Sequence, residues 1–176
     1  MRIAMTTTIL LAVLMNGCAA NVRKASETST VKVPAESSKK VVLNITGNKS
    51  ATGSSDWEQF KGEWRGALKT EAQAAGASFA VQEDEPKPIG EDGTLVVVFI
   101  NDYRYLSPGA RYGFGVMTGN AFIDSKISFT DLKSGRSFGQ QVYNTSSTAW
   151  QGIFSAMTEK QVQAISKEIM TEIKPR

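Results

Sequence analysis

The sequence contains no histidine and only one cysteine, Cys18, among its 176 residues. Without histidine the protein lacks the commonest general base, and a Ser-His-Asp arrangement is excluded. A single cysteine forms no disulfide within the chain, and without histidine it cannot complete a usual zinc site. We therefore predict no catalytic residues, no metal site and no cofactor, and a protein that is not an enzyme.

The chain also lacks an excess of charge and a long apolar run. Its 20 basic and 17 acidic residues give a net charge of +3, which is too balanced to indicate a nucleic-acid partner. The unbroken apolar run at residues 9–15 is much shorter than the roughly 20 residues that a transmembrane helix needs. This run therefore does not predict a spanning helix.

What the chain does have is a start typical of a secretory signal. Arg2 is a short basic region, residues 9–15 form the apolar core, and Asn16, Gly17 and Cys18 follow it. A basic start, a short apolar core and small residues at the cut are the three parts of such a signal. We therefore expect export from the cytoplasm.

Residues 14–18 resemble the lipobox of bacterial lipoproteins, although Met15 and Asn16 stand where such boxes usually carry leucine and a small residue. The resemblance implies that Cys18 is acylated and becomes the mature N-terminus, and several acyl chains would anchor the protein stably in a membrane. Ala19 after the cysteine resembles the signal for the outer membrane, with the protein facing the periplasm. An ordinary cleaved signal stays open as the alternative.

Composition divides the chain into three parts. Residues 1–17 are the expected signal peptide. Residues 18–39 hold the lipidated cysteine and then few bulky apolar residues, so we expect a disordered tether there. A tether of that length would span about 25 Å and let the domain stand off the membrane. Residues 40–176 are long enough for a single folded domain.

Hydrophobic periodicity predicts an α+β domain. Alternating or continuous apolar runs bounded by turn residues predict strands at residues 41–46, 78–82, 95–105, 121–132 and 137–144. Stripes at helical spacing, each behind a capping-box pattern, predict helices over residues 56–75 and 158–173. We expect a mainly antiparallel sheet of about five strands with both amphipathic helices on one face.

Four details of this prediction concern packing. The apolar run at residues 95–100 indicates a strand buried on both faces. Trp57 and Trp64 lie on the helical stripe, which favours core packing over a sugar-stacking platform. Gly66, in the middle of the same helix, is interpreted as a close approach of the helix to the sheet. The strand at residues 137–144 is expected to place Phe138 and Val142 on one face.

A second resemblance covers roughly the C-terminal half. The buried strand from residue 95, residues 111–115 with Gly119, the turn at residues 131–135 and the closing helix resemble a family of small uncharacterised bacterial lipoproteins, a domain of unknown function. That resemblance implies no activity, no cofactor and no catalytic residues.

Three hypotheses for function follow. The first is a non-catalytic binding or accessory domain that contacts another envelope protein or a polymer. The second is a lipid-anchored hydrolase of cell-wall glycan, which needs two carboxyl groups across a cleft; Asp102 and Asp124 are the candidates. The third is a purely structural envelope lipoprotein. The acidic loop at residues 83–93 lacks the spacing of a calcium loop and is interpreted as solvated.

Overall fold

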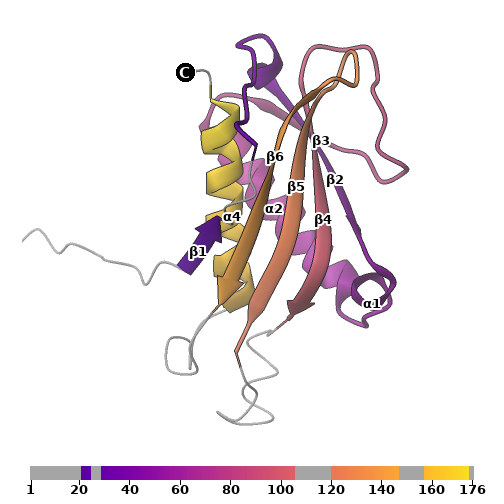
Figure 1. The fold of residues 1–176 in the computed structure, drawn as a ribbon, viewed down its shortest axis with the longest axis vertical. Helices are drawn as coiled ribbons and strands as arrows, with labels where there is room; N and C mark the ends of the chain where they lie inside the picture. Colours follow the sequence, from indigo (N-terminus) through magenta and orange to yellow (C-terminus); the bar gives the residue numbers. More distant parts are fainter. Residues whose placement is uncertain (1–20, 25–28, 106–119, 147–156, 175–176) are drawn as a thin grey trace, which may run out of the picture.

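The computed structural model describes residues 21–24, 29–105, 120–146 and 157–174. These residues form one six-stranded sheet with helices α2 and α4 side by side on one face (Figure 1). The elements in chain order are β1 (Asn21–Lys24), the 3-10 turn η1 (Ser37–Lys39), β2 (Lys40–Gly47), α1 (Lys49–Thr52), α2 (Trp57–Ala74), β3 (Ser78–Val81), β4 (Thr94–Arg104), β5 (Phe122–Asp131), β6 (Ser137–Ser146) and α4 (Met157–Ile173).

The strand order is β1-β6-β5-β4-β2-β3. The pairs β1–β6, β6–β5 and β5–β4 are antiparallel, whereas β2 is parallel to both β4 and β3. The predicted α+β class, the two helices and the mainly antiparallel sheet are confirmed. The sixth strand, β1, was not predicted.

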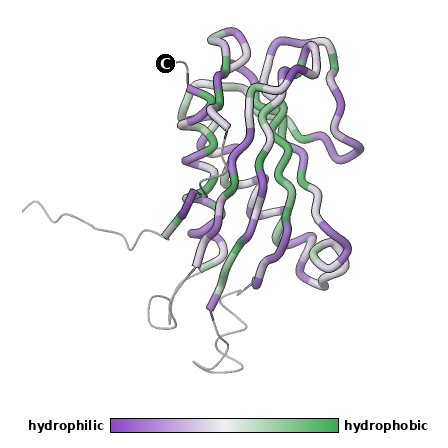
Figure 2. Tube along the Cα trace, viewed as in Figure 1, coloured by the Kyte–Doolittle hydropathy of each residue, from purple (hydrophilic) through white to green (hydrophobic). Residues whose placement is uncertain are grey.

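The core lies between the sheet and the two helices. Alternate residues of the central strands face α2 and α4, because successive side chains of a strand point to opposite faces. The buried side chains of this layer include Val96, Val98, Ile100, Ile127 and Phe129 from the sheet, Phe60, Trp64 and Leu68 from α2, and Val162, Ile165 and Ile169 from α4. Figure 2 shows hydrophobic stretches along the central strands and hydrophilic ones in the upper turns.

Strand β4 is not buried on both faces, contrary to the prediction from its continuous apolar run. Phe99 is 38% exposed and Val97 is half-buried, because both helices cover the opposite face of the sheet. At the upper part of the uncovered face, Val42, Leu95 and Leu132 form a small buried cluster.

Helix α2 lacks the predicted capping box at its start and ends in a glycine motif. Its N-cap residue, Asp56, makes no side-chain capping hydrogen bond, so the box predicted at its start is not formed. At the other end Gly76 has φ +75°, and the backbone N–H groups of Gly76 and Ala77 donate to Gln73 and Ala72 at 3.0 and 2.9 Å. This is a Schellman motif, in which glycine takes the left-handed position.

The interpretation of Gly66 is wrong, and this yields a prediction. Added Cβ atoms at Gly62 and Gly66 would meet nothing within 4 Å, because both residues are on the exposed side of α2. Alanine at each position should raise the free energy of unfolding by about 1 kcal/mol through helix propensity, measured by urea denaturation. Gly76→Ala is the control, and it should lower stability because its backbone φ is positive. A loss of stability in the first two variants would contradict this account.

Residues 21–39 are not a disordered tether where the structure describes them. Strand β1 pairs with the end of β6, and residues 29–33 continue along the same edge. Val31 is 4% exposed and belongs to the main core, and the N–H of Lys32 donates to the carbonyl of Phe138 at 3.1 Å. The folded domain therefore includes residues that composition assigns to the tether.

Two further contacts hold this edge in place. The Lys24 ammonium lies 2.9 Å from carboxylates of both Glu168 and Glu172 on α4. Burial alone would lower the pKa of Lys24, but the hydrogen bonds and charges of these two carboxylates raise it overall. At Gly139, with φ +136°, an added Cβ would lie 3.0 Å from the carbonyl oxygen of Thr30 and 3.1 Å from the Cα of Val31. Only glycine allows that close approach without strain.

Candidate binding surface on the open face of the sheet

The face of the sheet that α2 and α4 leave uncovered is called the open face. It carries the outward-pointing side chains of β2, β4, β5 and β6. In Figure 1 it is turned toward the viewer, with the two helices behind it. Because its strands lie at the centre of the sheet, its side chains are held by a paired backbone rather than by a loop.

The acidic loop after β3 lies beside the upper part of this face and is tied down there. The Asn44 side-chain amide of β2 donates to the carbonyl oxygens of Gln82 and Asp84, each at 2.8 Å. Three carboxylates of this loop are paired with cations: Glu83 with Arg65, Glu91 with Lys40, and Asp92 with Lys133. Within the described ranges no group of three or more His, Cys, Asp or Glu side chains could hold a metal ion.

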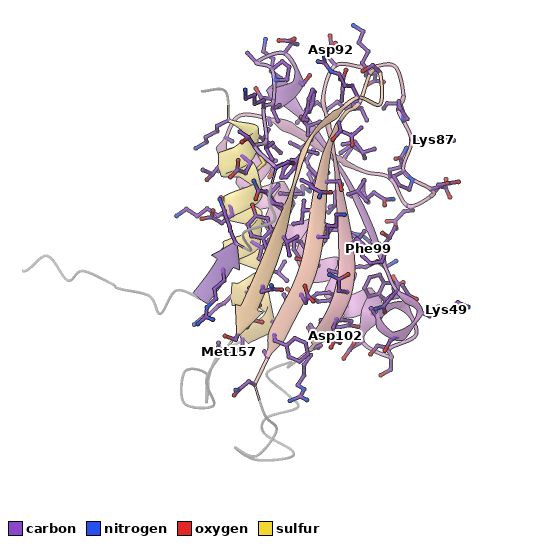
Figure 3. The ribbon with its side chains drawn as sticks, viewed as in Figure 1. Lys49, Lys87, Asp92, Phe99, Asp102 and Met157 are labelled. Atoms are coloured by element: carbon purple, nitrogen blue, oxygen red, sulfur yellow. The ribbon has the colours of Figure 1, made fainter. Side chains whose placement is uncertain are left out.

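The middle of the open face carries a row of three neighbouring side chains, here called the Phe99 row. The register places Phe99 of β4 opposite Lys126 of β5, and Lys126 opposite Val142 of β6. Lys126 is exposed and Val142 is half-buried. Among the exposed large apolar side chains of the described ranges, only Phe99 lies on an inner strand (Figure 3).

The cation of this row stands apart from the ion pairs of the domain. Among the described residues, Lys126 takes part in none of the ion pairs, which all join other side chains. A lysine can cover apolar neighbours with its methylene stem while its ammonium stays in water. The row is thus an amphipathic strip. The aromatic ring of Phe99 and the aliphatic side chain of Val142 lie on either side of the exposed positive charge of Lys126.

The lower end of the open face combines a second aromatic ring with a second cation. The guanidinium of Arg104 lies over the ring of Phe122, 5.8 Å from its centroid. These two residues are register partners on β4 and β5. An arginine on an aromatic face is stabilised electrostatically by about 0.5–1 kcal/mol at an exposed site.

The two carboxylates considered for glycan cleavage come together on this face. A β-bulge between Ile100 and Asp102 sets Asp102 opposite Asp124 on the neighbouring strand. Each is engaged by a neighbour: Asp102 accepts the N–H of Tyr103 at 2.8 Å, and Asp124 accepts from the Asn101 side chain at 3.2 Å. Figure 3 shows Asp102 toward the lower end of β4.

Neither carboxylate lines a described cavity. One pocket of about 290 Å³ lies between residues 30–33 and the end of α4, at Glu172 and Lys174. Another of about 110 Å³ lies between the C-terminal ends of α2 and α4. Both are away from the open face, so neither of these two cavities holds a sugar chain between Asp102 and Asp124.

The second strand of the hairpin differs from the prediction at one residue. Phe129 pairs with Gly139 and Thr130 with Ser137, so Phe138 is the extra residue of a bulge. Phe138 packs in the core on the helix side, whereas Val142 is on the open face. The expectation that both lie on one face is therefore wrong, because strict alternation cannot anticipate a bulge.

At the lower end of β4, Tyr103 and Tyr105 connect the sheet to α2. The ring of Tyr103 stacks on Phe60 with centroids 4.1 Å apart and planes at 4°, and its hydroxyl donates to Asp56 at 2.5 Å. The Tyr105 hydroxyl donates to Glu63 at 3.2 Å. Burial and the hydrogen bond to Asp56 raise the pKa of Tyr103 from 10.0 to about 12.

This pKa gives a pH prediction. The folded protein holds the Tyr103 proton more tightly than the unfolded chain, so its contribution to stability is fully present below pH 10 and is lost as the pH rises toward about 12. Tyr103→Phe should therefore make the fall in the free energy of unfolding between those pH values shallower. The measurement is urea denaturation across this range. The pKa of Tyr143 is also raised by burial, but Tyr143 is present in both proteins, so its contribution cancels in the comparison.

Several sequence expectations fall outside the described residues: the signal peptide at residues 1–17, Cys18, Ala19, and the stretch containing residues 111–115 and Gly119. No helix in the described part of the chain is both long and apolar enough to cross a membrane.

Comparison with solved structures finds proteins of similar fold. The dodecamer of a PelC variant from Paraburkholderia phytofirmans matches with a TM-score of 0.52 and 13% sequence identity, over 89% of this chain and 98% of that one. A protein described only as uncharacterized matches with a TM-score of 0.50 and 12% identity, over 81% and 96% of the two chains. A protein from Xanthomonas campestris, assigned to a family of unknown function, reaches a TM-score of 0.46 with 9% identity, over 80% and 88%.

These likenesses have a limited meaning. At such identities the first two matches show a shared fold and nothing more. No protein-family model matches the sequence, and no curated protein does so. The function must therefore be argued from this chain's own residues.

Sequence reasoning placed the strands of the open face but missed the face itself. It predicted the strand at residues 121–132, and the structure places Lys126 and Asp124 of this strand on the open face. It took the apolar run of β4 as doubly buried, which concealed Phe99. The number of predicted helices was the signal that could have revealed this exposure, because two helices on one face leave the other face of an antiparallel sheet in solvent.

Proposed function

We propose that this protein is a bacterial envelope lipoprotein, anchored in the outer membrane through acylated Cys18 and facing the periplasm, whose domain is a non-catalytic binding or accessory module. Its partner is another envelope protein, which the domain engages with the Phe99 row of the open face. The observation that carries the proposal is this row: an exposed aromatic ring on an inner strand, next to a lysine outside the described ion pairs, on a face that no described helix covers.

Physical reasoning supports the open face as the contact. A large aromatic ring left 38% exposed on a rigid strand gains free energy when a partner removes it from water, at roughly 25 cal/mol per Å² of apolar surface. Lys126 beside it adds directionality, because its charge favours a partner with a carboxylate at the matching place. Aromatic side chains such as Phe99 are enriched at interface centres.

The signal pattern and the lack of histidine support the rest of the proposal. The start of the chain has the parts of a lipoprotein signal, and the whole sequence offers no histidine for general-base chemistry. The PelC protein of similar fold is a dodecamer, so a second copy of this chain is one envelope protein that could occupy the open face.

Site-specific photo-crosslinking in the native host tests the proposal. A photoreactive phenylalanine analogue replaces Phe99, and the control carries it at Lys69, which is exposed on the outer side of α2. We expect discrete crosslinked species from position 99 that are absent from position 69, with a several-fold lower yield when Lys126→Glu is added. Species at multiples of the protein's own mass would identify a second copy. Equal or irreproducible crosslinking at the two positions would refute the open face as the contact.

A hydrolase acting on cell-wall glycan is the second candidate, and the pairing of Asp102 with Asp124 is the observation that favours it. Its test is the release of muropeptides by the variants Asp102→Asn and Asp124→Asn. Activity that is lost in both would support hydrolysis and displace the binding role. Unchanged release in both removes this candidate.

A further inference from the structure

The order of residues 21–24 changes how the domain must sit on a membrane. Strand β1 begins at Asn21, only three residues after Cys18. Three residues in a fully extended chain span at most about 10 Å. The expected tether of residues 18–39 would have allowed a distance of about 25 Å, and the structure removes most of that length.

Detachment of strand β1 from the sheet, which would lengthen the linker, is opposed by several contacts. All four of its residues are in register with residues 143–146 of β6, and Lys24 at its end is paired with Glu168 and Glu172 of α4 at 2.9 Å. Val22 packs against the main core. Releasing β1 would expose this apolar surface and take the Lys24 cation away from the two carboxylates of α4.

The register then identifies which end of the domain is next to Cys18. Asn21 is opposite Ser146, Ser146 is opposite Phe122, and Phe122 is opposite Arg104. These residues form one row across four strands at the lower end of the sheet in Figure 1. The β5–β6 turn, with Ser134 at its tip, is at the other end of β5, about 30 Å away for ten residues of strand.

We infer that this lower end, here called the lower rim and defined by Ser146, Phe122 and Arg104, lies on the headgroup layer of the bilayer in the acylated protein. The inference rests on the proposed acylation of Cys18. The occupant is a phospholipid surface, because the linker holds Asn21, at this end of the sheet, within about 10 Å of Cys18. The sheet then rises from the membrane, and the open face is presented sideways to a neighbour.

The chemistry of the rim fits that surface. Arg104 is exposed and lies over the ring of Phe122. Arg23 is also exposed and stands one open-face row further from Cys18, opposite Asn144. Arginine donates to phosphate oxygens, and an aromatic ring beside it suits the boundary between headgroups and acyl chains. Asp124 and Asp102 share that second row with Arg23, because Asn144 is opposite Asp124 and Asp124 is opposite Asp102.

Fluorescence quenching in vesicles tests this orientation. The natively acylated protein is reconstituted into phosphatidylethanolamine–phosphatidylglycerol vesicles that contain a headgroup-labelled nitroxide lipid. Ser146→Cys and Ser134→Cys form a matched pair, since both serines are exposed and acylated Cys18 leaves the new thiol as the single site for a dye. We expect quenching several-fold stronger at position 146 than at position 134.

Two further measurements separate the possible failures. The intact mass of the reconstituted protein reports acyl chains on Cys18, and their absence would overturn both the proposed function and the inference. Acyl chains together with equally weak quenching at both positions would overturn the rim alone. Inserting ten glycine and serine residues between Ala20 and Asn21 should reduce quenching at position 146 to the level at position 134. Unchanged quenching would refute the short linker as the cause.

Discussion

Replacing Trp64 by alanine is expected to lower the free energy of unfolding by about 3–5 kcal/mol. Trp64 is 0% exposed and heads the fully buried side chains by volume. Its ring meets the ring of Phe60 edge to face, with centroids 6.2 Å apart. Alanine would leave a cavity between α2 and the sheet that the paired strands cannot close, so both the burial and the packing of the indole are lost.

The indole nitrogen of Trp64 makes Trp64→Phe an informative companion. That nitrogen is buried without a hydrogen-bond partner among the described residues, and a buried unsatisfied donor is unfavourable by roughly 1–3 kcal/mol. Phenylalanine removes the donor and keeps much of the volume, so it should cost less than half of what alanine costs. Lys69→Ala, on the exposed side of the same helix, is the surface control and should change stability by less than about 0.5 kcal/mol. A loss below about 1 kcal/mol for Trp64→Ala, in urea denaturation, would contradict the packing described for α2.

The success of sequence reasoning at Trp64 has a simple cause. Trp57, Phe60, Trp64 and Leu68 recur at three- and four-residue spacing, and that period reports one side of a helix whatever the helix packs against. The same holds for α4 and for the alternation along β5. These elements contain their own signal of burial, and the structure places each within a few residues of its predicted bounds.

Where the burial of a residue depends on a distant part of the chain, the local sequence pattern does not predict it. Residues 21–24 show no periodic pattern of apolar residues, and composition alone makes them look like a flexible linker. Their order comes from residues more than a hundred positions away: the backbone of β6 and the carboxylates of Glu168 and Glu172. The exposure of Phe99 is likewise decided by where the helices lie, which no local pattern in β4 encodes.

Val31→Asp separates the two descriptions of the N-terminal segment. In a disordered tether the substitution would leave stability unchanged. In the structure Val31 is 4% exposed, in the main core and against Gly139. A carboxylate there would be buried in apolar surroundings, and an uncompensated buried charge is unfavourable by roughly 3–5 kcal/mol. We therefore expect a loss of that size in the free energy of unfolding, measured by urea denaturation.

The neighbouring residue supplies the matched control. Lys32 is exposed, so Lys32→Ser should change stability by less than about 0.5 kcal/mol. Gly139→Ala tests the same contact from the β6 side, because its Cβ would press on the backbone of Thr30 and Val31. If Val31→Asp and Gly139→Ala both leave stability unchanged, the segment is not part of the domain. The linker after Cys18 would then be long, and the lower rim would have no reason to lie on the membrane.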